Sequence, residues 1–296
     1  MHRRTKEHLI KQAFLATAIT SLAILGLIMG FLFMEGLPTF GFVSVKAFLT
    51  GVDWYPTDEA RPDYGVLPLI AASGAVTALS SLLAIPLGVM SAVYLAEIAS
   101  PRVRAVAKPV IEMLASLPSV VIGFFGMVVL APFLQEFLDI PIGLNLFNAS
   151  LMLAFMSVPT IASVSEDAIY AVPRELKEAS LALGATHLET LIRVTIPAAL
   201  SGIGTAVILG MSRAIGETMV VLMVAGGAAI LPDSLFGPIR PMPASIAAEM
   251  AEAPFRSHHY HSLFAIAMVL FLVTLAFNML ADYISHKHRQ TGSASL

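Results

Sequence analysis

Residues 174–227 read RELKEASLALGATHLETLIRVTIPAALSGIGTAVILGMSRAIGETMVVLMVAGG. The first part of this stretch is polar, follows a helical pattern and is interrupted at Gly184. The second part is a long apolar run that carries one arginine, Arg213, and one glutamate, Glu217. A polar helical hairpin that leads into a membrane-spanning helix with an internal charge pair suggests two activities, docking of a partner protein and handling of an ion.

The composition of the whole chain favours a protein embedded in lipid. Of its 296 residues, 57% are hydrophobic and only 12% are charged. Average soluble domains carry about twice that charged fraction, so much of the apolar surface must face something other than water. The net charge of -3, with no basic domain and no basic patch interleaved with aromatic residues, does not indicate nucleic-acid binding. The absence of cysteine excludes disulfides and thiolate metal sites.

Six apolar runs are each close to the ~20 residues with which an α-helix crosses a ~30 Å hydrocarbon core. The first is longer than the apolar region of a signal peptide, so we expect it to be retained as a span. We predict an all-α, polytopic membrane protein with a cytoplasmic helical hairpin between its fourth and fifth spans. The domains are 1–66 (tail, first span and first outer loop), 67–285 (transmembrane domain) and 286–296 (polar cytoplasmic tail). The predicted spans are 12–34, 67–95, 109–134, 147–165, 202–230 and 262–284.

The distribution of lysine and arginine predicts how the spans are oriented. With the N-terminus inside, the inner segments hold twelve of these residues and the outer segments hold four. This agrees with the positive-inside rule, which the opposite orientation would violate. Both termini are therefore predicted to be cytoplasmic, in a multi-pass protein of the plasma (inner) membrane. The inner residues are Arg3, Arg4, Lys6, Lys11, Arg102, Arg104, Lys108, Arg174, Lys177, Arg193, Lys287 and Arg289, and the outer ones are Lys46, Arg61, Arg240 and Arg256.

The polar hairpin carries start and stop signals for two helices. Pro173 suits the first turn of a helix, where its missing N–H costs nothing. Gly184 stands where a left-handed C-cap would end that helix. Thr186 and Glu189 then have capping-box spacing and predict a second helix, which runs to Pro197. These signals predict helix, glycine turn and helix, and by themselves they fit a solvated surface hairpin as well as a docking element.

The spacing within the hairpin resembles the EAA loop of ABC importer permeases, which covers residues 174–197 here. Glu178, Ala179 and Ser180 are followed by three residues, Gly184, nine residues and the segment 194–197, VTIP. The family pattern has a second alanine, an isoleucine and a leucine where this chain has Ser180, Val194 and Ile196. In such permeases the loop forms a coupling helix that fits a cleft on a cytoplasmic ATPase subunit. The resemblance implies that the coupling residues are Glu178, Ala179, Leu183, Gly184 and Pro197.

Arg213 and Glu217 are four positions apart, so on a continuous helix they would share one face and form an ion pair. A charge near the middle of a membrane costs about 2.5–3.5 kcal/mol on insertion scales and is seldom present without a role. One interpretation is a self-neutralised pair that fixes helix packing. The other is an anion site, because a guanidinium matches tetrahedral oxyanions bidentately. We predict that both residues line the substrate pathway, with Glu217 holding Arg213 in place.

The segment 210–226, GMSRAIGETMVVLMVAG, resembles the R-A-x-G-E-T-M segment of phosphate importer permeases, most closely the PstC branch of the phosphate-specific (Pst) system. YGVLPLI, IPLGVMSAVYLAEIASPRVR and LASLPSVVIGFFG agree as well. The resemblance implies a MetI-like transmembrane domain and a permease subunit for inorganic phosphate. It also implies a second, PstA-like permease, two PstB-like ATPase subunits and an extracytoplasmic phosphate-binding protein, with ATP used by the partner subunit.

Other functions and sites are less consistent with the sequence. No lysine lies in a nucleotide-binding loop, so the chain is predicted to be neither an ATPase nor another enzyme, and to bind no cofactor itself. His258, His259 and His261 lie in the segment 231–261, which we predict to be a solvated loop without a metal site. The alternatives are an ABC permease for sulfate, molybdate or phosphonate, an ATPase-independent secondary transporter, and a membrane enzyme.

Overall fold

The computed structural model describes residues 2–58 and 60–289, with side chains for 7–58 and 60–283. Among these residues the only strands form an antiparallel pair, Trp54–Tyr55 (β1) with Asp63–Tyr64 (β2). The helices are α1 (His2–Gly36), α2 (Val45–Thr50), α3 (Leu67–Val93), α4 (Pro101–Ala115), α5 (Ser119–Phe125), α6 (Ala131–Leu138), α7 (Leu146–Tyr170), α8 (Arg174–Ala182), α9 (His187–Thr190), α10 (Ile196–Ile215), α11 (Met219–Val224), α12 (Met242–Glu249) and α13 (His258–Arg289). A 3-10 turn is η1 (Leu37–Gly41), and π turns are η2 (Tyr94–Ile98), η3 (Gly126–Leu130) and η4 (Leu191–Thr195).

Six helical segments of the described chain are long and apolar enough to cross a membrane. The predicted all-α architecture with six spans is therefore confirmed. The predicted polar tail begins at residue 286, but α13 continues through Arg289, and residues 290–296 lie outside the described part. The six segments are Glu7–Gly41, Leu67–Ile98, Ser119–Leu138, Leu146–Tyr170, His187–Ile215 and His258–Tyr283.

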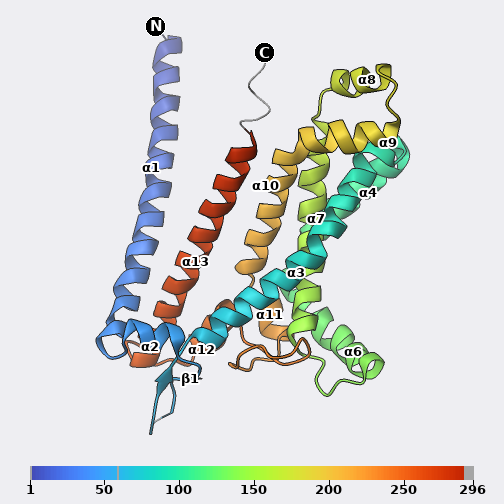
Figure 1. The fold of residues 1–296 in the computed structure, drawn as a ribbon. Coiled ribbons are helices and arrows are strands. Elements are labelled where there is room, and N and C mark those ends of the chain that lie inside the picture. Colours follow the sequence, from blue (N-terminus) through green and yellow to red (C-terminus); the bar gives the residue numbers. More distant parts are fainter. Residues whose placement is uncertain (1, 59, 290–296) are drawn as a thin grey trace.

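The two ends of the helical bundle carry different elements (Figure 1), and we call them the hairpin face and the opposite face. The hairpin face carries α8 and α9, and α1 begins and α13 ends near this face. The opposite face carries α2, the two strands, α12 and α6. Between the faces, α1 packs along α13 at one flank, while α3, α7 and α10 pack against one another at the centre.

Small residues bring the three central helices close together. Ile161 of α7 is 1% exposed and lies between glycines of its two neighbours. A Cβ on Gly88 of α3 would lie 2.7 Å from the Cβ of Ile161, and a Cβ on Gly210 of α10 would lie 2.5 Å from its Cγ1. In lipid, helices associate mainly through van der Waals packing, which favours small residues at contacts. The two glycines therefore fix how closely α3 and α10 approach α7.

The third span differs from its predicted extent, 109–134. Pro109 lies inside α4, which ends at Ala115, and the helix starts again at Ser119. The cause is Pro118, which has no N–H to donate and disfavours the helical conformation of the residue before it. Pro118 adopts an extended ψ of 133° and becomes the N-cap of α5. The spanning segment is therefore Ser119–Leu138, and α4 is a separate helix.

The fifth span also differs from its predicted extent, 202–230. Pro197 does not end the second hairpin helix, and His187–Ile215 forms one continuous segment. The turn before the proline widens to a π turn, in which the N–H of Ile196 donates to the carbonyl of Leu191. The helix then ends at Ile215, with Gly216 as its C-cap, and α11 is a separate six-residue helix. The span therefore begins within the predicted hairpin and ends before Glu217.

The segment 231–261 is more ordered than the predicted solvated loop. It contains α12, and α13 begins at His258 because the hydroxyl of Ser257 accepts a hydrogen bond from the N–H of Tyr260 (3.1 Å) and caps the helix. His258 is exposed, but His259 is only 7% exposed. The prediction that these histidines are solvated is wrong for His259, which lies in the first turn of a packed helix.

Candidate functional site

The hairpin has the glycine turn that its sequence predicts, whereas Pro173, predicted in the first turn of α8, is instead its N-cap. α8 starts directly after Pro173 and ends before Gly184, whose φ of +88° is left-handed. The N–H of Gly184 donates to the carbonyl of Leu181 at 3.0 Å, which closes the turn. A Cβ on Gly184 would meet nothing within 4 Å, so the requirement for glycine is conformational rather than steric.

The capping box that opens α9 is confirmed. The hydroxyl of Thr186 accepts a hydrogen bond from the N–H of Glu189 at 3.3 Å, and the carboxylate of Glu189 accepts one from the N–H of Thr186 at 2.9 Å. Two amides at the start of the helix are thereby satisfied. Because α9 continues through η4 into α10, this cap also begins the fifth span.

The outer surface of the hairpin presents an apolar side chain to solvent. Leu183 is 90% exposed at the turn, and Glu178, Ala179 and Gly184 are also exposed. The hairpin thus brings together four of the five residues predicted to couple to an ATPase. Pro197 is also exposed but lies apart from them, in the first turn of α10.

Two side-chain contacts brace α8 against the rest of the chain. Lys177 forms an ion pair with Glu97 in η2, at the end of the second span. The hydroxyls of Ser180 and Thr190 are hydrogen-bonded at 2.9 Å and join α8 to α9. α8 is therefore held by side-chain contacts to the second and fifth spans and not only by its chain connections.

A buried carboxylate at the hairpin face was missed by the sequence analysis. The side chain of Glu166 on α7 is 1% exposed and forms ion pairs with Arg104 and with Lys108 (2.6 Å), both on α4. Lys108 also pairs with Asp167, and the guanidinium of Arg104 lies 3.9 Å above the ring of Tyr170. Burial opposes the charge of Lys108, but its hydrogen bonds to Asp167 and Glu166 outweigh this and raise its pKa. The signal was available, because Arg104 and Lys108 are one helical turn apart and an acidic pair ends the fourth apolar run.

Arg213 lies exposed in the last turn of α10. Its Nη2 donates a long hydrogen bond, 3.4 Å, to the carbonyl of Ala115, the last residue of α4. The guanidinium therefore lies near the negative end of the α4 dipole. A guanidinium has five N–H donors, so this single contact leaves most of its capacity for another acceptor.

The predicted ion pair between Arg213 and Glu217 is wrong. Their spacing places them on one face only if the helix is continuous, and α10 ends at Ile215. The carboxylate of Glu217 turns to the next helix, where its Oε1 accepts hydrogen bonds from the N–H groups of Met219 (3.1 Å) and Val220 (3.2 Å). These amides begin α11 and favour a negative charge. Among the described side chains, no ion pair joins Arg213 and Glu217.

Two helix interruptions meet at this position. Residues 116–118 separate α4 from α5, and residues 216–218 separate α10 from α11. The hydrogen bond from Arg213 to Ala115 joins the two interruptions, and α5 packs closely on α11 because Gly123 lacks a side chain. The arrangement thus offers a cationic group beside non-helical backbone, which can hold an oxyanion.

Comparison with known protein families decides what kind of protein carries this arrangement. The model of the family described as "Binding-protein-dependent transport system inner membrane component" matches residues 84–290, more than two thirds of the chain. The chain belongs to this family of transport permeases.

The permease also has curated relatives along most of its length. It is 41% identical over 261 residues to the "Probable ABC transporter permease protein YqgH" of Bacillus subtilis, which covers 88% of this chain and 84% of the relative. It is 35% identical over 291 residues to the "Phosphate transport system permease protein PstC" of Mesorhizobium japonicum, which covers 91% of this chain and 86% of the relative. The relative of the same description from Haemophilus influenzae is 31% identical and covers 96% of this chain and 95% of its own.

Solved permease structures share the fold. A chain from a bacterial alginate ABC transporter, in complex with its alginate-bound periplasmic protein, matches 99% of this permease and 98% of its own length, with a TM-score of 0.68 at 16% identity. A chain from the methionine transporter MetNI, in an inward-facing conformation, matches 73% of this permease and 93% of its own length, with a TM-score of 0.58 at 20% identity. At these identities the likeness confirms the MetI-like fold.

We predict that Glu166→Gln destabilises the permease, because it leaves Arg104 and Lys108 without their buried partner. Removing one member of a buried ion pair costs about 3–5 kcal/mol, and the partial exposure of the two cations should reduce this to about 2–3 kcal/mol. The measurement is the thermal unfolding midpoint of the purified permease in detergent.

The matched control is Asp167→Asn, one residue along the same helix. The side chain of Asp167 is 63% exposed, so losing its ion pair with Lys108 should cost no more than about 1 kcal/mol. Equal midpoints for the two variants would show that Glu166 contributes no more than a surface charge.

Proposed function

We propose that this chain is a permease subunit of an ATP-driven importer of inorganic phosphate, and that it forms the translocation pathway with a second permease. Phosphate is supported as the substrate by the relatives described as phosphate transport system permease proteins. They are 30–35% identical to this chain over 79–96% of its length. Sulfate, molybdate and phosphonate, which the sequence left open, are less well supported because these relatives are phosphate permeases.

The hairpin face is, in this proposal, the cytoplasmic face of the plasma (inner) membrane. The excess of lysine and arginine in the segments on this side supports the assignment. The opposite face is then extracytoplasmic and meets the phosphate-binding protein. Both termini would be cytoplasmic.

The hairpin would dock on a cytoplasmic ATPase subunit. An apolar side chain as exposed as Leu183, outside the spans and at a turn held by Gly184, is suited to a partner's pocket. In this proposal, ATP binds and is hydrolysed in that partner, whereas this chain catalyses no reaction and binds no cofactor or metal. Since α9, η4 and α10 are continuous, a displacement of the hairpin would move the helix end at Arg213.

Arg213 would contact phosphate during passage. A guanidinium binds a tetrahedral oxyanion through two parallel N–H···O bonds, and its single long hydrogen bond to Ala115 leaves these donors accessible. Glu217 would act without forming an ion pair with Arg213. Its carboxylate caps α11 and so fixes the far side of the helix interruption.

The proposed assembly contains this chain, a PstA-like permease, two PstB-like ATPase subunits and an extracytoplasmic phosphate-binding protein. Support for partners of this general kind comes from the family description, which names binding-protein-dependent transport. The alginate transporter chain that shares the fold was likewise solved with a periplasmic protein. Lipid surrounds the spans.

We predict that Arg213→Gln lowers phosphate uptake about 10- to 100-fold, because hydrogen bonds to charged groups contribute about 1.5–3 kcal/mol each. Assembly with the ATPase subunits should be unchanged. The measurement is uptake of radiolabelled phosphate by proteoliposomes that contain the whole complex, with sulfate and molybdate as competitors. Arg102→Gln, which changes an exposed arginine on α4, is the matched control. Uptake that survives Arg213→Gln would contradict the assignment.

The same assay separates the two roles considered for Glu217. Glu217→Gln keeps an oxygen that accepts from the amides of Met219 and Val220, so a capping role predicts that most uptake is retained. Glu217→Ala removes the acceptor and should lower uptake. If Gln and Ala are equally damaging, the negative charge rather than the cap is required.

We predict that Gly184→Val lowers phosphate uptake and phosphate-dependent ATP hydrolysis together, by about tenfold, because a left-handed conformation costs a side-chain-bearing residue roughly 1–2 kcal/mol. Insertion in the membrane should be normal, since an added Cβ meets nothing in this chain. The control is Gly74→Val on α3, where a Cβ also meets nothing and the backbone is ordinary. Uptake at the control level in Gly184→Val would remove the docking role of this turn.

A further inference from the structure

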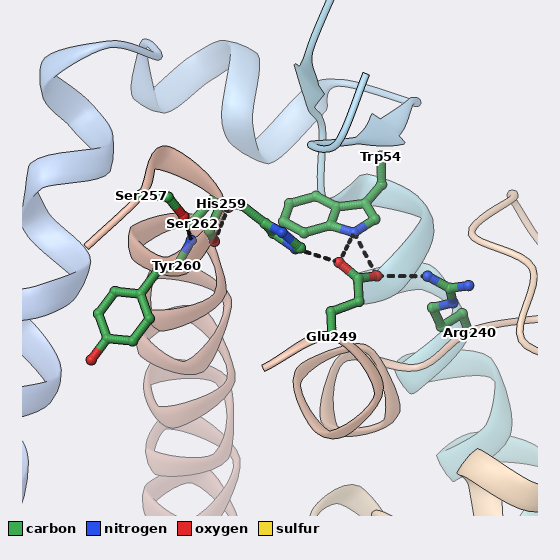
Figure 2. A network of polar contacts seen from close by, with 7 residues as sticks. All are labelled: Trp54, Arg240, Glu249, Ser257, His259, Tyr260 and Ser262. Atoms are coloured by element: carbon green, nitrogen blue, oxygen red, sulfur yellow. Dashed lines mark hydrogen bonds and ion pairs between the residues drawn. The ribbon is translucent and has the colours of Figure 1, made fainter. Parts of the chain in front are cut away.

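Glu249 joins four separate segments of the chain at the opposite face (Figure 2). It ends α12, and its carboxylate accepts hydrogen bonds from Nε1 of Trp54 (3.0 and 3.1 Å), Nη1 of Arg240 (2.6 Å) and Nε2 of His259 (2.8 Å). Trp54 belongs to β1, Arg240 to the segment after α11, and His259 to the first turn of α13. We call Trp54, Arg240, Glu249 and His259 the Glu249 clamp.

The clamp is a largely buried set of charge-assisted hydrogen bonds, in which the side chain of Arg240 is the most exposed at 29%. Trp54 is 2% exposed, and the side chains of His259 and Glu249 are 8% and 16% exposed. Buried donors and acceptors of this kind are costly to leave unpaired, and hydrogen bonds to an ionised group are stronger than neutral ones. The carboxylate of Glu249 is the acceptor for all three donors, so its loss would leave each of them without this partner.

One arm of the clamp reaches the chain that leaves α11. Nε of Arg240 donates to the carbonyl of Gly227 at 2.7 Å, while its Nη1 pairs with Glu249. Beside it, the N–H of Gly227 donates to the carbonyl of Ile239 (3.1 Å), and the N–H of Ile239 donates to the carbonyl of Ala225 (2.8 Å). Arg240 therefore connects the exit of α11 directly to the clamp.

The turn after α11 has little freedom to move independently. Gly226 and Gly227 both have left-handed φ values, +89° and +74°. A Cβ on Gly226 would lie 2.6 Å from the carbonyl oxygen of Leu144, so the backbone is closely packed there. α11 itself buries Val220, Val221 and Val224. α11 is therefore capped at its entry by Glu217 and tied at its exit, through Arg240, to Glu249.

We propose that Glu249 is a positioning residue for translocation, which acts through Arg240 to hold α11 and thereby the helix interruption at Arg213. The proposal rests on the function proposed above for its importance to transport, but the positioning itself does not depend on the substrate. α11 lies between the lower end of α10 and the opposite face (Figure 1). In this proposal, α11 held in this place restricts access to the interruption from that side.

The absence of cysteine from the sequence allows a direct test of position. Gly216 is exposed within the interruption, and an added Cβ would meet only the carbonyl oxygen of Ser212 at 3.9 Å. The thiol introduced by Gly216→Cys is labelled with a membrane-impermeant maleimide, added on the opposite face of complexes in oriented proteoliposomes. The rate is compared with and without Glu249→Gln, which weakens the bond to Arg240 by removing the charge.

The expected result is a labelling rate at least threefold faster with Glu249→Gln. The matched control is Glu252→Gln, a neutralised glutamate three residues further on that is exposed and should leave the rate unchanged. Arg240→Gln should give the same acceleration, and the two changes together should give no more than either alone, because they cut the same connection. A rate in Glu249→Gln equal to that in Glu252→Gln overturns the proposal.

A purely structural role would lower the amount of folded protein without changing the rate per folded molecule. The rate is therefore normalised to assembled complex, and the thermal unfolding midpoint of each variant is measured alongside. If Glu249→Gln does not fold, Arg240→Gln and Trp54→Phe serve as the test. Arg240→Gln must then accelerate labelling more than Trp54→Phe, because only Arg240 contacts the chain leaving α11; equal rates overturn the proposal. Phosphate uptake by the parent complex is measured separately, so a failure of the proposed function is distinguished from a failure of the clamp.

Discussion

The organisation of this permease depends on the continuity of one helical segment, His187–Ile215. A proline near the start of a span normally separates it from the helix before it, because the proline has no N–H and crowds the preceding turn. Here the π turn before Pro197 accommodates the ring without ending the helix. The exposed hairpin and the interruption beside Arg213 therefore lie at the two ends of one continuous helix, and Gly210, which packs on Ile161, fixes how closely its C-terminal part approaches α7.

Each side of the interruption is held by a different part of the molecule. The α10 side follows the hairpin, which is braced on the second span by Lys177 and Glu97. The α11 side is capped by Glu217 and connected through Arg240 to Glu249. A movement at the hairpin face and a contact at the opposite face can thus both change the interruption between α10 and α11.

Local signals in the sequence predicted the hairpin well, because caps and glycine turns are determined by a few neighbouring residues. Gly184, Thr186 and Glu189 have the predicted roles. The ion pair of Arg213 could not be judged in this way. Glycine is tolerated inside membrane helices, so Gly216 gave no indication that α10 ends there. Because the helix ends between Arg213 and Glu217, their four-residue spacing no longer places them on one face. Glu166 was missed because the fourth span extends to Tyr170, five residues beyond its predicted end at residue 165, and this places the carboxylate inside the protein.

The continuity of the helix can be measured directly with spin labels at Leu188→Cys and Gly216→Cys in the assembled complex. For a straight helix these 28 steps correspond to about 42 Å between the backbone positions. A rigid element predicts one narrow distance distribution, unchanged when ATP is added with a hydrolysis-deficient ATPase subunit. A broad distribution, or a shift of more than about one helical turn, roughly 5 Å, on ATP binding would show that the helix hinges at the π turn. That result would contradict direct mechanical coupling between the hairpin and Arg213.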